Sequence, residues 1–557
     1  MGPIASYDAE PTAIAGVLPV KAQCLPYAQI PHTTRLFLDF LSNFSKVQAF
    51  YPRTPNFSDW FKQEPSSLRY DNQRRARVSD VLERQHRAWD ASEKTIANIA
   101  RFRAGAFAAV TGQQVGLFGG PLFALLKALT AVKLAEEAST AGIDTVPVFW
   151  LATTDHDLAE VNHTALPVSG VGLQTIATTA HGVEQAPVGT IRFSDEIQAA
   201  LQSAIEILGE CPVTELLRNC YRPGDTLGSS FALLYTRLFS NWGVILLDPS
   251  DPELHRVAQP IYEAAIDRAA AIDDALLARG KQLEGAGYHQ QVKVTPSSTL
   301  LFTLKDGARV PIHRRLNGNS TEFLVNSDKL SREELLNQIA SAPENFSPNV
   351  LLRPIVQDHL LPTLAYTGGA AEVAYFAQAA VVYHELLGRV TPILPRFSAT
   401  LVEAKPQSLL EKYQLTLQDL FQGEEALREK IAARILPAEL QTAFDRAGAT
   451  VDQSLAGIRA ALLQLDKTLA EAADNAQSKM LHQLETLRGR AARAELRQSE
   501  LAARHAQQLS ASLYPNKTLQ EREIAGIYFL SRLGLDLLHT LYETLQPDCH
   551  DHQVITS

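Results

Sequence analysis

The stretch VTGQQVGLFGGPLFALLKALTAVKLA, Val110–Ala135, indicates a strand end, a glycine-rich turn and a long helix. The apolar run at 106–112 predicts a buried strand, and the helix is predicted over 121–138, because Pro121 suits a first helical turn. A second buried strand is predicted at 146–155. Strand, helix and strand within about 50 residues form a βαβ unit, so the sequence predicts a parallel sheet.

Later apolar runs indicate further strands of this sheet, at 242–249, 349–358, 363–369 and 390–396, with helical patterns at 252–281 and 371–387. The prediction is therefore an α/β fold with a doubly wound parallel sheet. Asp306-Gly307 lies between two β-rich runs and predicts a hairpin. The predicted organisation is a mostly helical segment 1–100, a core at 101–164, 241–284 and 346–400, insertions at 165–240 and 285–345, a helical domain 401–512 and a C-terminal segment 513–557.

The helical domain carries a coiled-coil pattern. Pro437 and Pro515 bracket a long stretch without proline, in which apolar residues step by three and four: Leu455, Ile458, Leu462, Leu465 and Leu469. A continuous helix over this stretch would reach ~110 Å at ~1.5 Å per residue, so its apolar stripe must be covered by another helix. Pairing with a second chain is slightly favoured, and a hairpin within one chain is the alternative.

Composition narrows the function classes. The chain has 557 residues, which suggests more than one domain, and a formal net charge of -10, which argues against a protein that binds nucleic acid through its overall charge. No apolar run is long enough to cross a bilayer. The four cysteines form no C-x-x-C pair, so neither disulfides nor a cysteine zinc site is expected, and a reducing cytoplasm fits.

The opening turn is the first candidate site. Its glycines, Gly116, Gly119 and Gly120, would let backbone N–H groups approach an anion at a helix N-terminus. Lys127 could reach the same anion, and Gln113 and Gln114 add amide groups at the strand end. Neither G-x-G-x-x-G nor G-x-x-x-x-G-K-[ST] is present, so a tight packing turn is an equally good interpretation.

The second candidate is TTDHDLAEVNH, residues 153–163, at the predicted C-terminal end of the next strand. Asp155 or Asp157 could hold an amine or a ribose hydroxyl, with His156 as acid or base. A helix starting at Asp155 would instead align His156, Glu160 and His163 for a metal ion, which is the less favoured interpretation. The alternative without a function is that these acidic residues only cap a helix.

The third candidate is LLRPIVQDHLLPTLAYTGGAAEVAYFAQ, residues 351–378. Polar side chains follow one predicted strand end, and a glycine pair with a glutamate follows another. The residues concerned are Arg353, Gln357, Asp358, Gly368, Gly369 and Glu372, with Arg396 after the next strand. Because the carboxyl ends of parallel strands share one edge of a sheet, we expect the three candidate segments to meet in one cleft.

Five segments together resemble the BshC family, the cysteine ligases of bacillithiol biosynthesis. They are TGQQVGLFGGPLFALLKA, FWLATTDHDLAEVNH, SPNVLLRPIVQDHLLPTLAYTGGAAEVAYFAQ, PILPR and LYPNKTLQER, and they span nearly the whole chain. The resemblance implies a Rossmann-like core similar to class I aminoacyl-tRNA synthetases, two insertions and a coiled-coil domain that forms a homodimer. It also implies a cytoplasmic enzyme that joins cysteine to glucosaminyl malate as an amide, in the last step of bacillithiol formation.

We assign roles to the candidate residues as the leading hypothesis for such a ligase. ATP, with Mg²⁺ as its partner, would bind at the Gln113–Pro121 turn with Lys127, while Asp155 and Asp157 orient an amine and His156 moves its proton. Arg353 would pair with a carboxylate of the substrate. No tightly bound metal, nucleic acid or membrane is expected.

The sequence departs from the family pattern in two places. Thr154 stands where a glutamate is expected, and Ala370-Ala371 interrupt an expected GGPGE. The HIGH and KMSKS motifs of the synthetases are also absent. Two other hypotheses therefore stay open: a nucleotide-binding scaffold that recruits partners through the coiled coil, and a metal-dependent hydrolase.

Overall fold

A computed structural model of the chain describes residues 21–168, 170–317, 320–434, 438–498 and 500–556. The chain forms two compact units, the second of which comprises Pro167–Leu173 and Val402–Gln520. The first unit holds the remainder, including the C-terminal segment from Glu521. Among the residues just given, no helix is both long and apolar enough to span a membrane.

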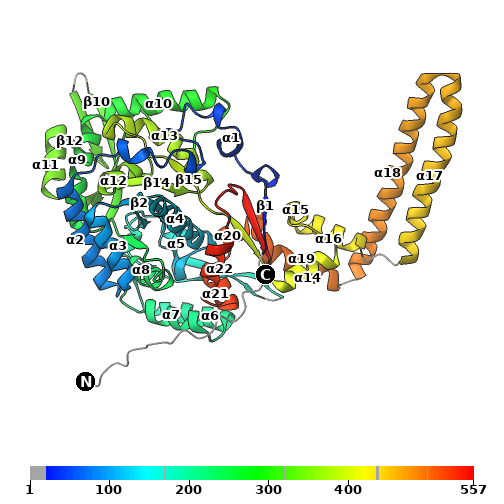
Figure 1. Cartoon of the computed structure of the whole chain (residues 1–557), viewed down its shortest axis with the longest axis horizontal. Coiled ribbons are helices and arrows are strands. Elements are labelled where there is room, and N and C mark those ends of the chain that lie inside the picture. Colours follow the sequence, from blue (N-terminus) through cyan, green and yellow to red (C-terminus); the bar gives the residue numbers. More distant parts are fainter. Residues whose placement is uncertain (1–20, 169, 318–319, 435–437, 499, 557) are drawn as a thin grey trace. The chain divides into compact units, whose positions relative to one another are not determined.

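A five-stranded parallel sheet forms the centre of the first unit (Figure 1). Its strands are β2 (Phe107–Gln113), β3 (Thr145–Leu151), β8 (Ile245–Leu247), β14 (Thr363–Gly368) and β15 (Ile393–Pro395). They lie in the order β15-β14-β2-β3-β8, and every neighbouring pair is parallel. This is the strand order of a Rossmann-like sheet, and it reverses direction between β2 and β14. The predicted parallel sheet is confirmed.

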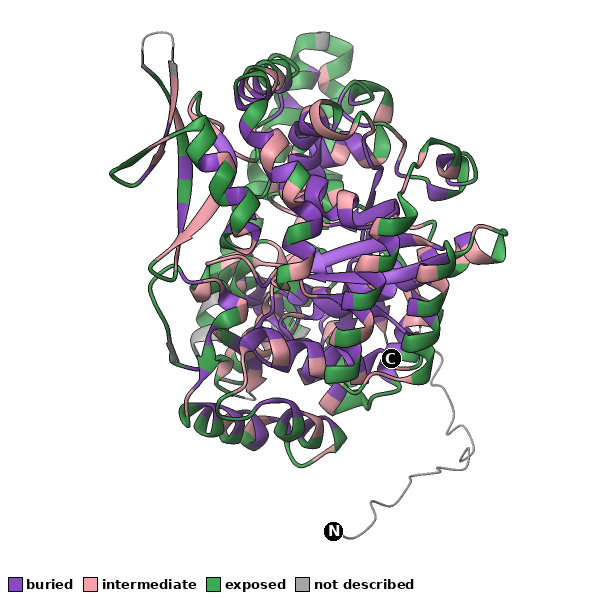
Figure 2. Cartoon of the chain, turned by 90° about the vertical axis from the view of Figure 1, so that its left-hand side faces the viewer, coloured by how far each residue is buried: buried purple, intermediate pink, exposed green. Residues whose placement is uncertain are grey.

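Helices cover both faces of this sheet, as a doubly wound fold requires. Val148 of β3 belongs to the core shared with Val81 and Ile99, which lie on α2 (Asn72–Ala88) and α3 (Glu93–Ala104). The next residue, Phe149, faces the other way, and its ring lies 5.3 Å from that of Tyr235 on α8 (Leu227–Leu238). Figure 2 shows the strands buried between helices whose outer faces are exposed.

Several other helices complete this unit: α1 (Arg35–Ser42), α4 (Leu122–Thr140), α5 (Leu158–Val161), α6 (Glu196–Leu208), α7 (Pro212–Cys220), α9 (Pro252–Asp267), α10 (Ala269–Gly285), α11 (Arg332–Ser341), α13 (Ala370–Leu387), α20 (Gln520–Glu523), α21 (Gly526–Leu533) and α22 (Leu537–Thr544). The helices predicted over 121–138 and 371–387 are confirmed as α4 and α13.

The predicted strand at 349–358 is wrong, because this stretch forms helix α12 (Arg353–Leu360). Asn349 starts the turn, since its side-chain oxygen accepts N–H bonds from Leu351 and Leu352, each 3.0 Å long. Pro354 then fits the first helical turn. An apolar run of this length suits a strand or a buried helix equally well, so the pattern alone misled.

The second insertion forms an antiparallel sheet in the order β12-β11-β10-β9-β13. Its strands are β9 (Ser298–Lys305), β10 (Ala308–Asn317), β11 (Ser320–Val325), β12 (Asp328–Ser331) and β13 (Phe346–Pro348). Asp306 and Gly307 have φ angles of 52° and 81° and join β9 to β10, which confirms the predicted hairpin. The first insertion carries the short strands β4 (His163–Val168), β5 (Gly172–Ala177), β6 (Ala180–His181) and β7 (Arg192–Phe193).

A third sheet joins the two ends of the described chain, in the order β1-β17-β16. These strands are β1 (Lys21–Leu25), β17 (His552–Thr556) and β16 (Ala399–Val402). Cys24 and Cys549 form a disulfide beside it, with Cα atoms 6.3 Å apart. The expectation of a chain without disulfides is therefore wrong, because pairing across 525 residues leaves no trace in local cysteine spacing.

The second unit is helical, with α14 (Ala404–Lys412), α15 (Leu417–Leu420), α16 (Glu424–Arg434), α17 (Ala438–Leu465), α18 (Lys467–Gln498) and α19 (Glu500–Leu513). The predicted seam does not continue in one helix. Asp466 separates α17 from α18 and caps the latter by accepting the Thr468 N–H at 2.8 Å, and the two helices pack as a hairpin (Figure 1). The intrachain hairpin is thus present, while Leu465 at its tip is 78% exposed.

Buried histidines predict that acid destabilises the first unit. Burial lowers the pKa of His86 and of His552 from 6.5 to about 4. Protonation between these pH values favours the unfolded chain, so stability is complete above pH 6.5 and falls toward pH 4. Each of the two histidines should lower the free energy of unfolding by about 2 kcal/mol between pH 7 and pH 5. Urea unfolding at both pH values measures the loss.

His552 provides the control for that measurement. Its ring bonds to Ser398 Oγ at 2.7 Å and Thr400 Oγ1 at 2.8 Å, contacts that a glutamine amide can replace without titrating. The His552→Gln variant should therefore lose less stability on acidification than the unaltered chain. An equal loss in both would contradict this explanation.

Candidate active site

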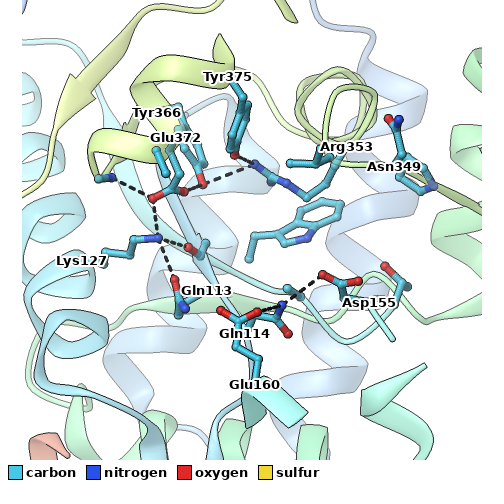
Figure 3. Close-up of a pocket in the computed structure, with 18 of the residues that line it drawn as sticks. Gln113, Gln114, Lys127, Asp155, Glu160, Asn349, Arg353, Tyr366, Glu372 and Tyr375 are labelled. Atoms are coloured by element: carbon cyan, nitrogen blue, oxygen red, sulfur yellow. Dashed lines mark hydrogen bonds and ion pairs between the residues drawn. The ribbon is translucent and has the colours of Figure 1, made fainter. Parts of the chain in front are cut away.

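A cavity of about 480 Å³ lies at the C-terminal edge of the parallel sheet, where the strand order reverses. It brings together many of the residues that the sequence singled out: Gln113, Gln114, Lys127, Asp155, His156, Glu160, Arg353, Gly369, Glu372 and Arg396. Figure 3 shows two polar groups across the cavity, one around Glu372 and Arg353 and one around Gln114, Asp155 and Glu160. The three candidate segments therefore meet, as predicted.

Lys127 and Glu372 form a buried ion pair at one side of the cavity. Lys127 is 3% exposed, and its ammonium lies 2.6 Å from Glu372 Oε2 and donates to Gly112 O at 2.7 Å and Gln113 Oε1 at 2.9 Å. Burial lowers the pKa of Lys127, which Glu372 opposes. Three acceptors engage its three hydrogens, so Lys127 holds β2, α4 and α13 together instead of reaching freely for a phosphate.

Glu372 also closes the N-terminus of α13. Its Oε2 accepts the Gly369 N–H at 2.8 Å, and its Oε1 accepts the Tyr366 hydroxyl at 2.6 Å. Burial would raise the pKa of Glu372, but Lys127 and these donors hold it below its usual value. Gly368 is required by this contact, because a Cβ there would lie 2.7 Å from that of Glu372.

Arg353 forms no direct ion pair with the described residues, and the carboxylate whose charge acts on it is that of Glu372, which shares the Tyr366 hydroxyl with it. Its guanidinium donates to Gln357 Oε1 at 2.9 Å and to the hydroxyls of Tyr375 at 2.9 Å and Tyr366 at 3.4 Å. In the described part of the chain, no carboxylate lies within ion-pair distance of it. A positioned guanidinium at a cavity wall is suited to bind a ligand carboxylate in a bidentate manner.

The opposite side is organised by Arg309, from β10 of the second insertion. Its Nη1 donates to Asp155 Oδ1 at 3.2 Å and to His156 Nδ1 at 2.9 Å, and its guanidinium stacks 4.0 Å from the Phe302 ring. Gln114 donates to Asp155 Oδ2 at 3.1 Å and to Glu160 Oε2 at 2.9 Å. Strand ends and an insertion thus fix Asp155 from both sides.

His156 is held in one protonation state by these contacts. Burial and the nearby Arg309 lower its pKa, so the ring is neutral near pH 7. Because Nδ1 accepts from Arg309, the ring hydrogen resides on Nε2. His156 is therefore arranged to donate a hydrogen bond, and taking up a proton would require it to release Arg309.

Arg396 lines the cavity but is already paired. Its Nη2 and Nη1 donate to the two carboxylate oxygens of buried Glu521 at 2.7 and 3.1 Å. The neighbouring Arg522 is exposed, lies 5.7 Å from the Phe123 ring and has no ion pair with any described residue. Arg522, and not Arg396, is the cation free to meet a ligand at the cavity opening.

The glycine-rich turn does not line the cavity. The Gly119 N–H donates to Tyr221 at 3.1 Å, its carbonyl accepts from Tyr235 at 3.0 Å, and the Gly120 carbonyl accepts the Gly526 N–H at 3.1 Å. A Cβ on Gly116 would lie 3.0 Å from Gly120 Cα. The turn therefore serves packing, and the expectation that Gly116, Gly119 and Gly120 face an anion is wrong.

Four other predicted residues also lie outside the cavity lining: Asp157, Gln357, Asp358 and Gly368. Gln357 and Asp358 are buried in α12, where Gln357 supports Arg353 and Asp358 bonds to the Tyr383 hydroxyl. Asp157 is exposed and caps α5 by accepting the Glu160 N–H at 3.3 Å. Asp157 thus matches the helix-capping interpretation.

The helix required by the metal hypothesis is absent. Helix α5 starts at Leu158, after His156, and His163 begins strand β4. The three residues therefore do not share a helical face. Among the described residues, no group of three or more His, Cys, Asp or Glu side chains is arranged to hold a metal.

Sequence reasoning missed several lining residues: Trp150, Phe302, Arg309, Asn349, Tyr366, Tyr375 and Arg522. Arg522 stands in LYPNKTLQER, a segment that carried the resemblance, so that segment could have supplied it. No local signal marked Arg309, because a β-sheet inserted elsewhere in the chain brings it to the site.

Comparison with known proteins agrees with this architecture. The family model for the N-terminal Rossmann-like domain of bacillithiol biosynthesis BshC matches residues 20–397, and the model for its C-terminal coiled-coil domain matches 399–557. A protein of Koribacter versatilis named "Putative cysteine ligase BshC" is 50% identical over 532 residues, covering 96% of this chain and 99% of that one. Relatives with the same name from Solibacter usitatus and Salinibacter ruber are 36% and 34% identical, over 96% and 93% of this chain and 99% and 96% of theirs. The chain therefore belongs to the BshC family of bacillithiol biosynthesis.

Proposed function

We propose that the protein is a ligase that joins cysteine to glucosaminyl malate through an amide bond, as the last step of bacillithiol formation. The observation that carries the proposal is one cavity in which the Arg353 guanidinium, without an ion pair among the described residues, lies across from the Asp155 and Glu160 carboxylates. A substrate with carboxylates at one end and an amine at the other matches this arrangement. The cytoplasm, where such small metabolites are made, is the proposed location.

Arg353 is the proposed anchor for the malate part. Tyr366 and Tyr375 hold its guanidinium, so little side-chain freedom is lost on binding. A malate carboxylate would supply the anion that the described residues do not. Substrate binding would thus place the amino sugar toward the Asp155 side of the cavity.

Amide formation needs an activated carboxyl and a neutral amine. We propose that a nucleotide such as ATP, with Mg²⁺ as its partner, activates the cysteine carboxyl, and that its oxygen departs with the phosphate or nucleotide leaving group. The amine then attacks the carbonyl carbon and loses a proton. Because Arg309 engages His156 Nδ1, the carboxylates of Asp155 and Glu160 are better placed than His156 to receive this proton.

The nucleotide would bind near Gly369 and the first turn of α13, with Arg522 at the opening, and not at the glycine-rich turn. Ala370 and Ala371 line the cavity at a helix N-terminus, which favours anions, whereas the Gly369 N–H already donates to Glu372. The Ala370-Ala371 departure from the family pattern leaves the backbone N–H groups of these two alanines in place. The same feature would serve a nucleotide-binding scaffold, so the assay below distinguishes turnover from binding.

Purified protein should be incubated with cysteine, glucosaminyl malate and ATP, and the products analysed by mass spectrometry. The proposal predicts a thiol product equal in mass to the two substrates less water, with stoichiometric ADP or AMP. Nucleotide binding without product, alone or with cell extract, would favour the scaffold hypothesis.

We also propose that the α17–α18 hairpin mediates a homodimer. Ile458, Leu469 and Met480 are 50%, 41% and 49% exposed, so the hairpin leaves apolar surface uncovered. Light scattering of the full chain should give twice the mass of one chain. The Ile458→Glu/Met480→Glu variant should give the mass of one chain, and a monomeric unaltered protein would contradict the proposal.

A further inference from the structure

Two polar atoms at one face of the sheet edge, one on Gln114 and one on Trp150, have no hydrogen-bond partner among the described residues. Gly112 and Gln114 on and after β2 lie beside Trp150 and Ala152 on and after β3, and all four line the cavity. Residues two apart in a strand share a face. Gly112 leaves room for the indole, because a Cβ there would lie 3.1 Å from that of Trp150.

Gln114 presents an unsatisfied acceptor. Its Nε2 donates to Asp155 and Glu160, which fixes the amide orientation, because the reverse would set the carbonyl against two carboxylates. The Gln114 Oε1 is then buried with no hydrogen-bond partner in the described part of the chain. Buried polar atoms are normally paired, so this oxygen indicates a missing donor.

Trp150, which lines the same cavity, carries an unsatisfied donor. The side chain is 2% exposed, and its Nε1 finds no acceptor among the residues that the structure describes. Buried indole N–H groups usually donate to an acceptor. A ligand that satisfies both atoms must bring a hydrogen-bond donor to Gln114 and an acceptor to Trp150.

The charge around Gln114 specifies the donor. Arg309 pairs with Asp155, whereas Glu160 has no ion pair within the described residues. Burial and the nearby Asp157 and Asp155 raise the pKa of Glu160 more than the cations Arg522 and Lys127 lower it, so a further cation placed there would be stabilised. A cationic donor therefore fits this site better than a neutral one.

We propose that Gln114 Oε1 and Glu160 form a subsite for a primary ammonium group whose neighbouring oxygen accepts from Trp150 Nε1. This deepens the proposed function and rests on it, because both proposed substrates carry an amine beside an oxygen. In cysteine the neighbour is the carboxylate, and in glucosaminyl malate it is a sugar oxygen. The shared chemistry is the ammonium with its adjacent acceptor.

Calorimetry on the full chain can separate these sources. Cysteine is compared with 3-mercaptopropionate, and glucosaminyl malate with glucosyl malate, so that each pair differs in the amine. In at least one pair, the unaltered protein should bind the ligand with the amine about tenfold or more tightly than the ligand without it, as expected for charged hydrogen bonds. This ratio of affinities is the amine preference. Glu160→Gln and Gln114→Leu should each remove most of this preference, and Trp150→Phe should weaken the amine ligand.

Controls make each outcome decisive. Glu136→Gln removes the same charge from an exposed position on α4, outside the cavity lining, and should keep the preference. The preference should also decrease as the pH falls through the raised pKa of Glu160, and Glu160→Gln should flatten this dependence. Thermal unfolding verifies that every variant is folded.

Binding and product formation are scored separately. No amine preference in the unaltered protein, or an unchanged preference in both Glu160→Gln and Gln114→Leu, would overturn the subsite even if product forms. An amine preference that these variants abolish, without product from cysteine, glucosaminyl malate and ATP, would support the subsite and overturn the ligase proposal.

Discussion

Replacing Arg353 with methionine should reduce kcat/KM for glucosaminyl malate by about 100-fold to 1,000-fold, the range expected when a buried carboxylate loses its charged partner. The described residues offer Arg353 hydrogen bonds to Gln357, Tyr366 and Tyr375 but no carboxylate. Its charge is therefore available to the substrate. Steady-state kinetics of thiol product formation measure the change.

The substrate can be varied as well as the residue. An analogue with lactate in place of malate lacks one carboxylate, and the unaltered enzyme should use it poorly. Arg353→Met should use both substrates at similar low efficiency, while Arg353→Lys should retain part of the malate preference, because it keeps the charge without the bidentate geometry. A folded Arg353→Met variant that still prefers malate strongly would exclude this role.

Replacing Lys127 with methionine should lower the free energy of unfolding of the first unit by about 3–5 kcal/mol, because Glu372 would remain buried without its cation. The same pair fixes the N-terminus of α13, so product formation should also fall. Denaturant unfolding followed by circular dichroism measures the loss. Glu372→Gln should lower the free energy of unfolding by a similar amount, because Lys127 would then remain buried without its anion.

The double variant Lys127→Met/Glu372→Gln should be less destabilised than the sum of the two single variants, because neither charge is then left alone. Lys133 on the same helix is the matched control. Its ammonium donates to the Leu545 carbonyl at 2.8 Å, so Lys133→Met should cost only about 1 kcal/mol. Equal losses in Lys127→Met and Lys133→Met would show that the buried pair has no special role.

The parallel sheet could be predicted because its strands are short apolar runs followed by turn or helix signals. The run at 349–358 has the same composition but becomes α12, since Asn349 and Pro354 start a helix. The turn between the two helices of the coiled coil could not be predicted either, because the spacing of the leucines continues across it. Asp466 lies within this spacing and caps the second helix.

The candidate site could be predicted only where one strand end supplies the residues. Asp155 reached the cavity as expected, because the turns after parallel strands share an edge. Arg353 also lines the cavity, but from the first turn of helix α12 and not from the predicted strand end. Arg309 could not be foreseen, since an inserted sheet delivers it. The position of Lys127 was correct but its role was not, because sequence spacing does not reveal that three neighbouring acceptors engage it.

The most direct test of the proposed ligase site is a crystal structure of the protein with glucosaminyl malate. A malate carboxylate should contact the Arg353 guanidinium, and the sugar amine should point to the side of the cavity formed by Asp155, Gln114 and Glu160. Binding of the substrate outside this cavity, or with its carboxylates away from Arg353, would exclude this site.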